Sequence, residues 1–466
     1  MLTLKNDATL DIKDLPGSLI NNIKSKLTIA NPKLKKNMQL GLSLHGIAAT
    51  LKCYTEENGF LHIPIGFTGE VLKLLPHSFF NDQRTNGNPI KLEFRGKLRS
   101  YQIDALDTLK EQSVGVISSP TGSGKSVMMC SLIVDKAVQT LVLVNTLELA
   151  NQFKQNLLKY TSIKEDNIYL FGGGSQFDLG LVTIALFQSM DKLPDSGYEL
   201  INKKVGMVLT DEVHITGATT YFRTLSKIAA KRKYGFSATP EREDGLTPLI
   251  HFASGPIRKQ ITFEDVGNNI MKPVLEVIET DYHFPLFDMT EFTSMISDLS
   301  INEERNNLIV KSLIPYKDKQ KVLLCSRVMQ CLLLQKQIPN SKILVGAISK
   351  EDRAQLSKYF SEAEIQKILK QRGKKYRKEV VKELNSGELK TVISTYRLFA
   401  LGLDFAGLEV AAFCAPIKAQ IQVKQCRGRI MRVNADKQPI CIDFQDSRVG
   451  LLKSHSKIRQ RLLKRF

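Results

Sequence analysis

The chain has 466 residues, 42% of them hydrophobic, and a formal net charge of +19 with a pI near 9.5. This length is more than one hydrophobic core usually supports, so we expect two or three domains. The sequence has no run of about 18 apolar residues and no opening signal peptide, which argues against a membrane-spanning or exported protein. The excess charge predicts a polyanionic partner, most simply nucleic acid, with an anionic membrane surface as the competing explanation.

The seven cysteines are scattered singly, without a Cys-x-x-Cys pair or a histidine at ligand spacing. We therefore expect neither a disulfide framework nor a zinc site. Small thiols within apolar strands are ordinary core residues in a reducing compartment. The sequence thus predicts a cytoplasmic protein with no membrane or zinc partner.

Residues 1–90 are predicted to form a small α+β accessory domain. Residues 49–54 and 60–65 are expected to pair as a hairpin, because Asn58-Gly59 lies in the turn between them. A basic cluster at 33–36 contains three lysines, for which a solvated loop and a phosphate contact are both open interpretations.

Beyond residue 90, short apolar strands alternate with helical stretches, which is typical of parallel α/β sheets. The first series of strands is predicted at 114–118, 141–145, 168–171, 181–185, 205–210 and 234–237. The second series is predicted at 321–326, 342–346, 391–395, 410–415 and 439–443. We therefore expect an α/β fold with two successive parallel-sheet lobes, at 91–260 and 321–447, and a connector at 261–320 that carries a helix over 295–314.

Two segments are strongly basic. Residues 364–382 are predicted as a helical insertion within the second lobe, and residues 448–466 as a basic C-terminal helix with one apolar face. A solvated charged face and a contact with phosphate remain equally open for both.

A glycine-rich loop follows the apolar run 114–117 and leads into a helical stretch, which is the order of a P-loop. Its backbone N–H groups can surround a polyphosphate, Lys125 can reach the β- and γ-phosphates, and the Ser126 hydroxyl can ligate Mg²⁺. Ser119 stands where the usual pattern has its first glycine. The candidate nucleotide-binding residues are Thr121, Gly122, Ser123, Gly124, Lys125 and Ser126.

Asp211 and Glu212 end an apolar strand about 85 residues after the P-loop. In the predicted sheet, Asp211 can hold Mg²⁺ and Glu212 can orient and deprotonate the water that attacks phosphorus. Two acids at a strand end would otherwise be an ordinary polar turn.

In the second lobe, Gln425, Arg429 and Arg432 follow one another at helical spacing and are expected on one helix face. Such arginines can neutralise charge on a transferred phosphoryl group, whereas a surface stripe is the plainer alternative. Gly428 between them favours close packing, because glycine is costly in a helix.

The order of these motifs across residues 99–432 resembles the superfamily 2 helicases, with a DExH sequence at 211–214. This resemblance implies two RecA-like lobes that close on ATP and Mg²⁺, with nucleic acid crossing both. It also implies that Arg99 and Gln102 lie in the segment that reads adenine, that 237–239 is a linking motif, and that Gly402 and Asp404 belong to the ATP site. The nucleic-acid contacts that it implies are Asn145, Thr146, Gln188, Ser189, Ser326 and Thr395.

The small N-terminal domain and the helix containing Arg305-Asn306 look similar to those of phage UvsW-type branch-migration DNA helicases. That similarity implies a DNA-binding N-terminal domain and an ATP-dependent DNA helicase or translocase that moves 3′ to 5′. Its substrates would be forks and Holliday junctions in recombination, repair or replication, and its location would be the host cytosol if a phage encodes it. A DExH RNA helicase, a duplex DNA translocase without strand separation and a nonenzymatic DNA-binding protein with a relic P-loop are the alternatives.

Overall fold

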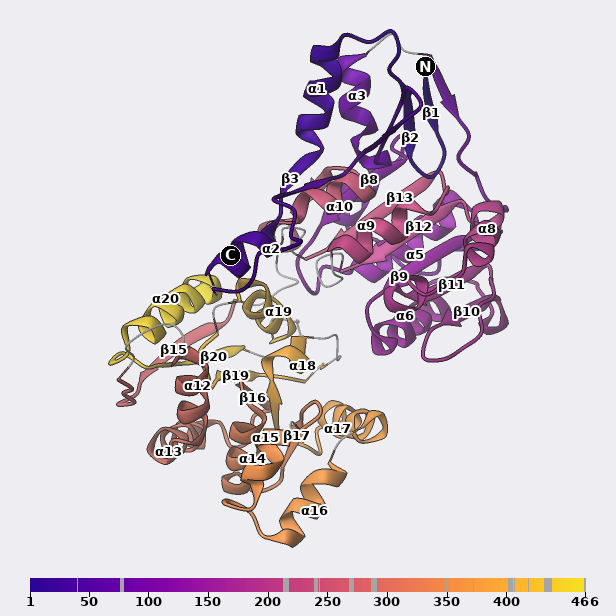
Figure 1. Cartoon of the computed structure of the whole chain (residues 1–466). Helices are drawn as coiled ribbons and strands as arrows, with labels where there is room; N and C mark the ends of the chain where they lie inside the picture. Colours follow the sequence, from indigo (N-terminus) through magenta and orange to yellow (C-terminus); the bar gives the residue numbers. More distant parts are fainter. Residues whose placement is uncertain are drawn as a thin grey trace. The chain divides into compact units, whose positions relative to one another are not determined.

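The computed structural model describes residues 1–39, 41–75, 79–212, 218–238, 242, 244–267, 272–285, 291–348, 350–371, 373–400, 405, 407–417, 419–430 and 438–464. The chain divides into two compact units, Met1–Asp265 and Val266–Phe466 (Figure 1). No described helix is long and apolar enough to cross a membrane.

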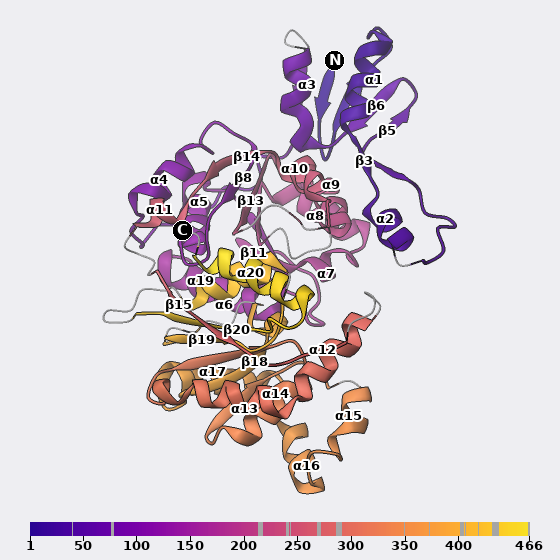
Figure 2. The same ribbon diagram turned by 90° about the vertical axis from the view of Figure 1, so that its left-hand side faces the viewer.

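The first unit begins with a five-stranded sheet in the order β5-β6-β2-β1-β7. Its strands are β1 (Leu2–Leu4), β2 (Ala8–Asp11), β5 (Thr55–Glu57), β6 (Phe60–Ile63) and β7 (Phe80–Asp82). Helices α1 (Gly17–Lys26) and α3 (Thr68–Leu74) lie beside this sheet, and the short helix η1 spans Ile65–Phe67 (Figure 2). β5 and β6 pair antiparallel around Asn58-Gly59, so the predicted turn and its second strand are present. The predicted first strand, 49–54, is wrong, because residues Thr50–Lys52 pair with Thr28–Ala30 and it is β5 that pairs with β6.

The N-terminal sheet packs on the parallel-sheet part of the same unit. One buried cluster joins Leu10 and Leu61 to Leu249 and Phe252 of a later helix. The backbones approach closely here, since a Cβ at Gly66 would lie 2.1 Å from the carbonyl oxygen of His251. A side chain at this position would force the two parts away from each other.

An arm leaves this N-terminal region as a two-stranded ribbon. Strands β3 (Thr28–Ala30) and β4 (Thr50–Lys52) pair antiparallel, and helix α2 (Pro32–Gln39) lies between them in the chain. Figure 2 shows α2 and the segment after it extending from the end of this ribbon.

The larger sheet of the first unit is parallel throughout, in the order β10-β11-β9-β12-β13-β8-β14. Its strands are β8 (Val114–Ser118), β9 (Thr140–Val144), β10 (Ile168–Phe171), β11 (Val182–Leu186), β12 (Met207–Asp211), β13 (Arg232–Ser237) and β14 (Ile257–Gln260). Continuous apolar runs such as Thr140–Val144, buried at every position, identify strands covered on both faces. This confirms the parallel α/β prediction for the first lobe.

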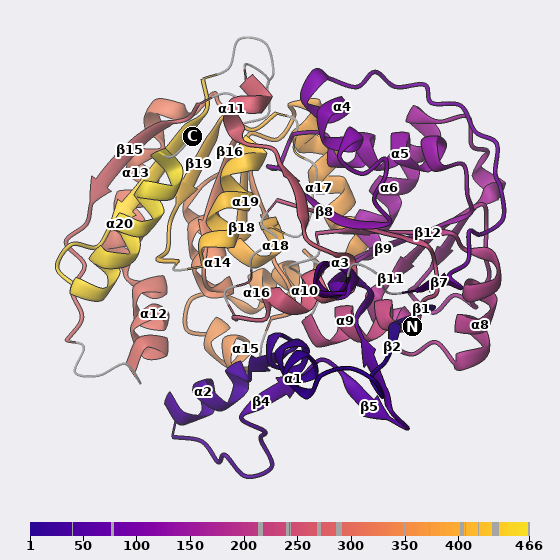
Figure 3. The same ribbon diagram turned by 90° about the horizontal axis from the view of Figure 1, so that it is seen from above.

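Helices cover both faces of this sheet, with α5 and α6 on one side and α9 and α10 on the other (Figure 3). The helices of this part are α4 (Ser100–Asp107), α5 (Lys125–Lys136), α6 (Leu147–Tyr160), η2 (Glu165–Asn167), α7 (Phe187–Met190), α8 (Asp195–Lys204), α9 (Ala218–Ser226), α10 (Thr247–Ser254) and α11 (Phe263–Val266). The crossover order places the carboxyl ends of β8, β12 and β13 side by side, which is where ligands bind in such sheets.

The second unit contains a six-stranded parallel sheet in the order β15-β20-β19-β16-β18-β17. Its strands are β15 (Val274–Glu279), β16 (Lys321–Cys325), β17 (Ser341–Leu344), β18 (Thr391–Thr395), β19 (Val410–Phe413) and β20 (Ile440–Gln445). The two sheets together confirm the predicted tandem α/β fold. β15 lies within the span 261–320 that the sequence predicts as a connector, and it forms the edge of this sheet.

Alternate residues of these strands face two helical layers. Leu323 of β16 packs with α13 and α14, whereas Val322 and Leu324 pack with α17 to α20. The helices of this unit are α12 (Phe292–Ile301), α13 (Glu303–Ser312), η5 (Ile314–Tyr316), α14 (Val328–Gln337), α15 (Lys350–Leu356), α16 (Glu362–Lys370), α17 (Lys374–Ser386), α18 (Tyr396–Ala400), α19 (Gln420–Ile430) and α20 (Gly450–Lys464).

The basic segment 364–382 differs from the single helical insertion that the sequence predicts. It consists of α16 and most of α17, which are separated around Gly373, a residue with a φ of +96°. Val380 and Leu384 of α17 are fully buried against the sheet. One face of this segment is therefore core, and the lysines occupy the rest.

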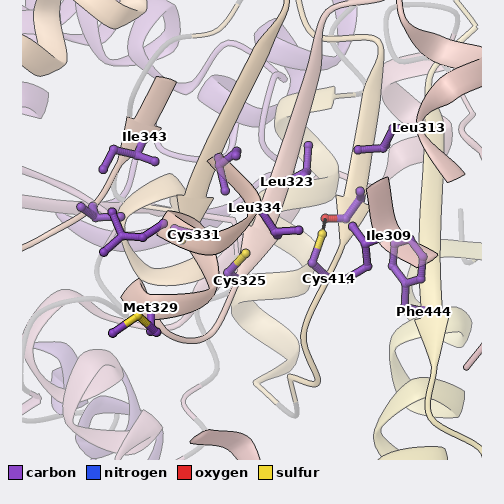
Figure 4. Close-up of a cluster of buried hydrophobic side chains, with 14 of the residues drawn as sticks. Ile309, Leu313, Leu323, Cys325, Met329, Cys331, Leu334, Ile343, Cys414 and Phe444 are labelled. Carbon is purple, nitrogen blue, oxygen red and sulfur yellow. Dashed lines mark hydrogen bonds between the residues drawn. The ribbon is translucent and has the colours of Figure 1, made fainter. Parts of the chain in front are cut away.

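The core of the second unit contains three thiols, those of Cys325, Cys331 and Cys414, among aliphatic side chains (Figure 4). Burial, with the neighbouring thiols, raises the pKa of Cys325 well above its ordinary value. All seven cysteines of the chain are buried and free of disulfides. Among the described residues, no three His, Cys, Asp or Glu side chains gather as metal ligands would.

Arg305, part of the helix that resembles the UvsW type, has a buried structural role. Its guanidinium pairs with Asp446 at 2.7 and 3.1 Å and donates to the Cys414 carbonyl at 2.6 Å. Both partners of the ion pair are about 1% exposed. This contact fixes α13 to the end of β20.

Candidate nucleotide site

The P-loop connects the end of β8 to the start of α5. Gly122 and Gly124 have φ values of +88° and +85°, which glycine adopts without strain. Gly124 precedes the first residue of α5, so the loop turns its backbone toward the N-terminus of a twelve-residue helix. Lys125 is buried at the first position of this helix, and the half-buried Ser126 follows it.

A second layer of polar contacts holds this loop in shape. Tyr101 and Gln102, both on α4, donate to the Ser123 carbonyl at 3.0 and 2.7 Å. The Gln102 side-chain oxygen accepts from the backbone N–H of Arg99 at 2.9 Å. The hydroxyls of Ser119 and Ser123 are hydrogen-bonded to each other. Ser119 therefore takes part in the loop, while Thr121 is half-buried beside it.

Two features of this layer were not evident from the sequence. No motif in the sequence predicts that Tyr101 contacts the P-loop, and its position next to Gln102 is the one signal that could have indicated it. Both ends of the Gln102 amide are used by the chain itself, and its side chain is buried. Gln102 thus connects the segment predicted to read adenine with the P-loop.

The two predicted acids lie at the same edge of the sheet as the P-loop. Asp211 is the last residue of β12, opposite Phe236 of β13, while Ser237 of β13 is opposite Ser118 of β8. Glu212 follows with a φ of +51°, a conformation that is uncommon outside glycine. Its backbone N–H donates to the Phe236 carbonyl at 2.8 Å.

Asp211 is a buried carboxyl group, and within the part of the chain that the structure describes one of its oxygens has no hydrogen-bond partner. Burial, with a further contribution from Glu212, raises its pKa from 3.8 to about 7, and Lys125 opposes the shift. A buried carboxylate oxygen without a partner is costly, and a cation would satisfy it. The Asp211 carboxylate suits Mg²⁺, which takes oxygen ligands and is usually held by one or two carboxylates together with water and phosphate oxygens.

Lys125 and Glu212 form an ion pair across the site, with Nζ 3.3 Å from Oε1. The same ammonium group donates to the Ser119 carbonyl at 3.2 Å. The site thus places a cation, a metal-suited carboxyl and a second carboxylate around one glycine loop. Such an arrangement can bind a magnesium nucleotide and activate water beside it.

The predicted nucleic-acid residues of the first unit lie at carboxyl ends of neighbouring strands. Asn145 follows β9, and its amide donates to the Glu212 carbonyl at 3.4 Å. Thr146 is the N-cap of α6 and accepts from Leu149 at 3.2 Å. Gln188 and Ser189, on α7, line a cavity of about 860 Å³ together with the loop 173–177.

In the second unit, Ser326 and Thr395 lie at the carboxyl ends of the neighbouring strands β16 and β18, where Cys325 is opposite Thr395. Ser326 follows β16 and donates to the Pro416 carbonyl at 3.1 Å, and Thr395 ends β18. Gln425 and Arg429 are both buried on α19. Gly402, Asp404 and Arg432 lie outside the described residues, as do His214 and Thr239 of the predicted motifs.

Arg427, which the sequence did not single out, is the most buried arginine of α19. Its guanidinium donates to the Leu462 carbonyl of α20, and burial lowers its pKa to about 10. Arg427 therefore joins two helices of one unit, although it stands beside the predicted phosphate-binding residues in the sequence.

Two family models match the chain in succession. The model "Type III restriction enzyme, res subunit" matches residues 95–242, and "Helicase conserved C-terminal domain" matches residues 324–434. The first covers the strand ends that carry the P-loop and the acids, and the second covers β17, β18, β19 and α19 of the second unit.

Curated relatives extend this similarity over most of the chain. "Putative helicase 161L" of Invertebrate iridescent virus 6 is 25% identical over 379 residues, which are 79% of this chain and 81% of that protein. "DNA 3'-5' translocase XPB2" of Sulfurisphaera tokodaii is 25% identical over 372 residues, 75% of this chain and 81% of that protein. Among solved structures, T4 UvsW matches at 16% identity over 99% of this chain and 96% of that chain, with a TM-score of 0.42.

The two helicase models match in the expected order, and viral and archaeal relatives cover three quarters or more of the chain. The P-loop and the two acids at one sheet edge agree with these matches. The chain therefore belongs to the superfamily 2 helicases and is an ATP-dependent enzyme of that family.

Proposed function

We propose that this helicase is an ATP-driven motor that moves on DNA and acts on branched substrates such as forks and Holliday junctions. The arrangement of Lys125, Asp211 and Glu212 around the P-loop carries the proposal, because it combines the groups that phosphoryl transfer to water requires. DNA is favoured by the net charge of +19 and by the relative named a DNA 3'-5' translocase.

Each group at the nucleotide site has a proposed task. Lys125 would neutralise the β- and γ-phosphates, while Ser126 and Asp211 would hold Mg²⁺. Glu212 would orient the attacking water and accept its proton. ATP, when bound, supplies the phosphoanhydride bond whose hydrolysis drives movement. Thr121, Gly122, Ser123 and Gly124 would direct backbone N–H groups at the phosphates.

The remaining site assignments are also proposals. Gln425, Arg429 and Arg432 would add positive charge near the transferred phosphoryl group, and Gly402 and Asp404 would contribute to nucleotide binding. Arg99 and Gln102 would recognise adenine. The DNA backbone would be held by Asn145, Thr146, Gln188, Ser189, Ser326 and Thr395. Thr395 ends a strand, Asn145, Thr146 and Ser326 follow strands, and Gln188 and Ser189 lie on α7.

The test is an ATPase and unwinding panel on the full chain. Its substrates are a four-way junction, a fork, linear duplex, single-stranded DNA and single-stranded RNA. We expect the fork or the junction to stimulate ATP hydrolysis most, strand separation to follow 3′ to 5′ movement, and Glu212→Gln to bind the substrates without hydrolysing ATP. Stimulation by RNA alone would contradict the DNA assignment, and an active Glu212→Gln would contradict the proposed catalytic role.

A duplex translocase that does not separate strands is the second candidate. The match to the res subunit of a type III restriction enzyme and the name of the archaeal relative both favour it. Displacement of a triplex-forming strand from linear duplex, together with forks left unopened, would identify this function.

A further inference from the structure

The ribbon and helix of residues 28–52, here called the arm, form a surface that the nucleotide site does not use. Between Asp14 and Glu56 the sequence has six lysines and no acidic residue. Lys24 and Lys26 pair with Glu56 and Glu70 at the base of the arm. Within the described residues, the four lysines of the arm itself make no ion pair; they are Lys33, Lys35, Lys36 and Lys52.

The tip of the arm presents large apolar side chains to solvent. Met38, Leu42 and Leu44 are 62%, 55% and 39% exposed. No described residue between 31 and 50 is buried, and none belongs to a hydrophobic core. Apolar side chains so exposed on a structured projection indicate a binding surface rather than packing.

The arm is nevertheless held in a defined shape by its own hydrogen bonds. Asn31 closes the outer end of the ribbon, because its backbone N–H donates to the Ala49 carbonyl at 2.9 Å and its side-chain amide to the Ala48 carbonyl at 2.8 Å. Asn37 ties α2 to the returning segment by donating to the Ser43 carbonyl at 3.0 Å. The tip is thus supported on a paired ribbon, which lowers the entropic cost of binding.

We propose that this arm engages the branch point of the nucleic acid, with Met38, Leu42 and Leu44 against the last base pair and the lysines on the flanking phosphates. Apolar side chains can stack on or enter a base step, while lysine contacts supply affinity that does not depend on sequence. Because the arm has no acidic residue, its charge is complementary to that of a polyanion. Its apolar tip is complementary to the exposed, apolar face of a terminal base pair. This inference rests on the proposed function, to which it adds the element that separates the strands.

The test compares two variants of the full chain with a matched control for each. The first is Met38→Ser/Leu42→Ser/Leu44→Ser, with Ile314→Ser as its control, since Ile314 is 65% exposed in the other unit. The second is Lys33→Gln/Lys35→Gln/Lys36→Gln, with Lys203→Gln/Lys204→Gln, two exposed lysines of α8, as its control. Circular dichroism and thermal melting establish that all four are folded.

The readouts are fork unwinding relative to ATPase activity on single strands, and the fluorescence of 2-aminopurine at the branch. We expect the apolar variant to lower the unwinding-to-ATPase ratio at least tenfold and to abolish the fluorescence change. The lysine variant should weaken fork binding and lower its logarithmic salt slope by about 2 to 3, since each phosphate contact contributes about 0.9. The two controls should match the wild type.

An unchanged ratio and fluorescence in the apolar variant would overturn the proposal. Sedimentation with anionic vesicles that depends on Met38, Leu42 and Leu44, with fork behaviour unchanged, would assign the arm to a membrane surface instead. If the proposed function itself is wrong, the wild-type protein will show no ATPase stimulation by any nucleic acid. This outcome is distinct from a failure of the arm variants alone.

Discussion

Lys125 Nζ lies 3.3 Å from Glu212 Oε1, so the cation of the P-loop is neutralised by the carboxylate proposed to activate water. Both side chains are largely buried, at 9% and 15% exposure. An incoming phosphate must therefore compete with Glu212 for the ammonium group. This relationship leads to the first prediction.

Glu212→Gln should bind ATP at least as tightly as the wild type and should lower kcat by about 10² to 10⁴-fold, the usual contribution of a general base. Removal of the carboxylate charge frees Lys125 for the phosphate. Equilibrium binding of a fluorescent ATP analogue and steady-state ATPase assays measure the two effects. Lys125→Ala is the comparison, since it should lose binding as well. Weaker ATP binding by Glu212→Gln would show that the ion pair does not compete with the nucleotide.

Gly124→Ala should disrupt the P-loop. The φ of Gly124 is +85°, and a Cβ there would lie 2.4 Å from the Gln102 side-chain nitrogen. The strain should cost about 1 to 3 kcal/mol of stability and displace Gln102 from the Ser123 carbonyl. Thermal melting with and without ATP tests this. Gly69→Ala, in α3 with open space around it, should instead stabilise the protein by about 0.5 to 1 kcal/mol.

Lys233 should make stability depend on pH in the alkaline range. Burial, with a further contribution from Arg84, lowers its pKa from 10.5 to about 7, and its Nζ donates to the Leu225 carbonyl at 2.8 Å. Between pH 7 and 10.5 the unfolded chain holds a proton that the folded chain has released. The free energy of unfolding should therefore rise with pH over this window.

Lys233→Met should remove that contribution and raise stability at neutral pH, since no charge then needs to be buried. Urea unfolding at several pH values from 6.5 to 9.5 measures the difference from the wild type. The exposed substitution Lys203→Met should leave the pH dependence as it is. If the free energy of unfolding of Lys233→Met rises with pH as steeply as that of the wild type, another group must cause the pH dependence.

Arg305→Met should strongly destabilise the second unit, because it leaves Asp446 buried without its cation. Breaking a buried ion pair on one side costs about 3 to 5 kcal/mol. Arg448→Met, which removes a pair whose arginine is 62% exposed, should change stability by no more than about 0.5 kcal/mol. Chemical unfolding of the full chain compares them. Equal effects would mean that water reaches Asp446.

The sequence predicted the parallel sheets and the strand ends of the nucleotide site because those strands are unbroken apolar runs. β15 was missed for the opposite reason. It is an edge strand with exposed Val274 and Val277, so its pattern resembles a connecting segment. The predicted helix over 295–314 is two helices, since the Asn302 side chain caps α13 by accepting from Arg305.

Polar residues were harder to assign, because tertiary contacts decide their roles. Arg459 looked like part of a basic surface on the last helix, yet it is 1% exposed and paired with Asp443. The resemblance to the superfamily 2 helicases assigned Gln102 to the recognition of adenine. Its hydrogen bond to the P-loop, to the Ser123 carbonyl, depends on a turn more than twenty residues away along the chain. Spacing along the chain carries no signal for either contact.

The contact between Arg305 and Asp446 also decides how the gene can be divided. A fragment that starts at Lys321, the predicted beginning of the second lobe, would lose β15 and leave the edge of β20 open. It would also lose α13, and with it Arg305, so that Asp446 would remain buried without the cation that neutralises it. Expression of the second unit as a separate protein should therefore start near Val266, where the chain divides, and a soluble product is expected only from the longer fragment.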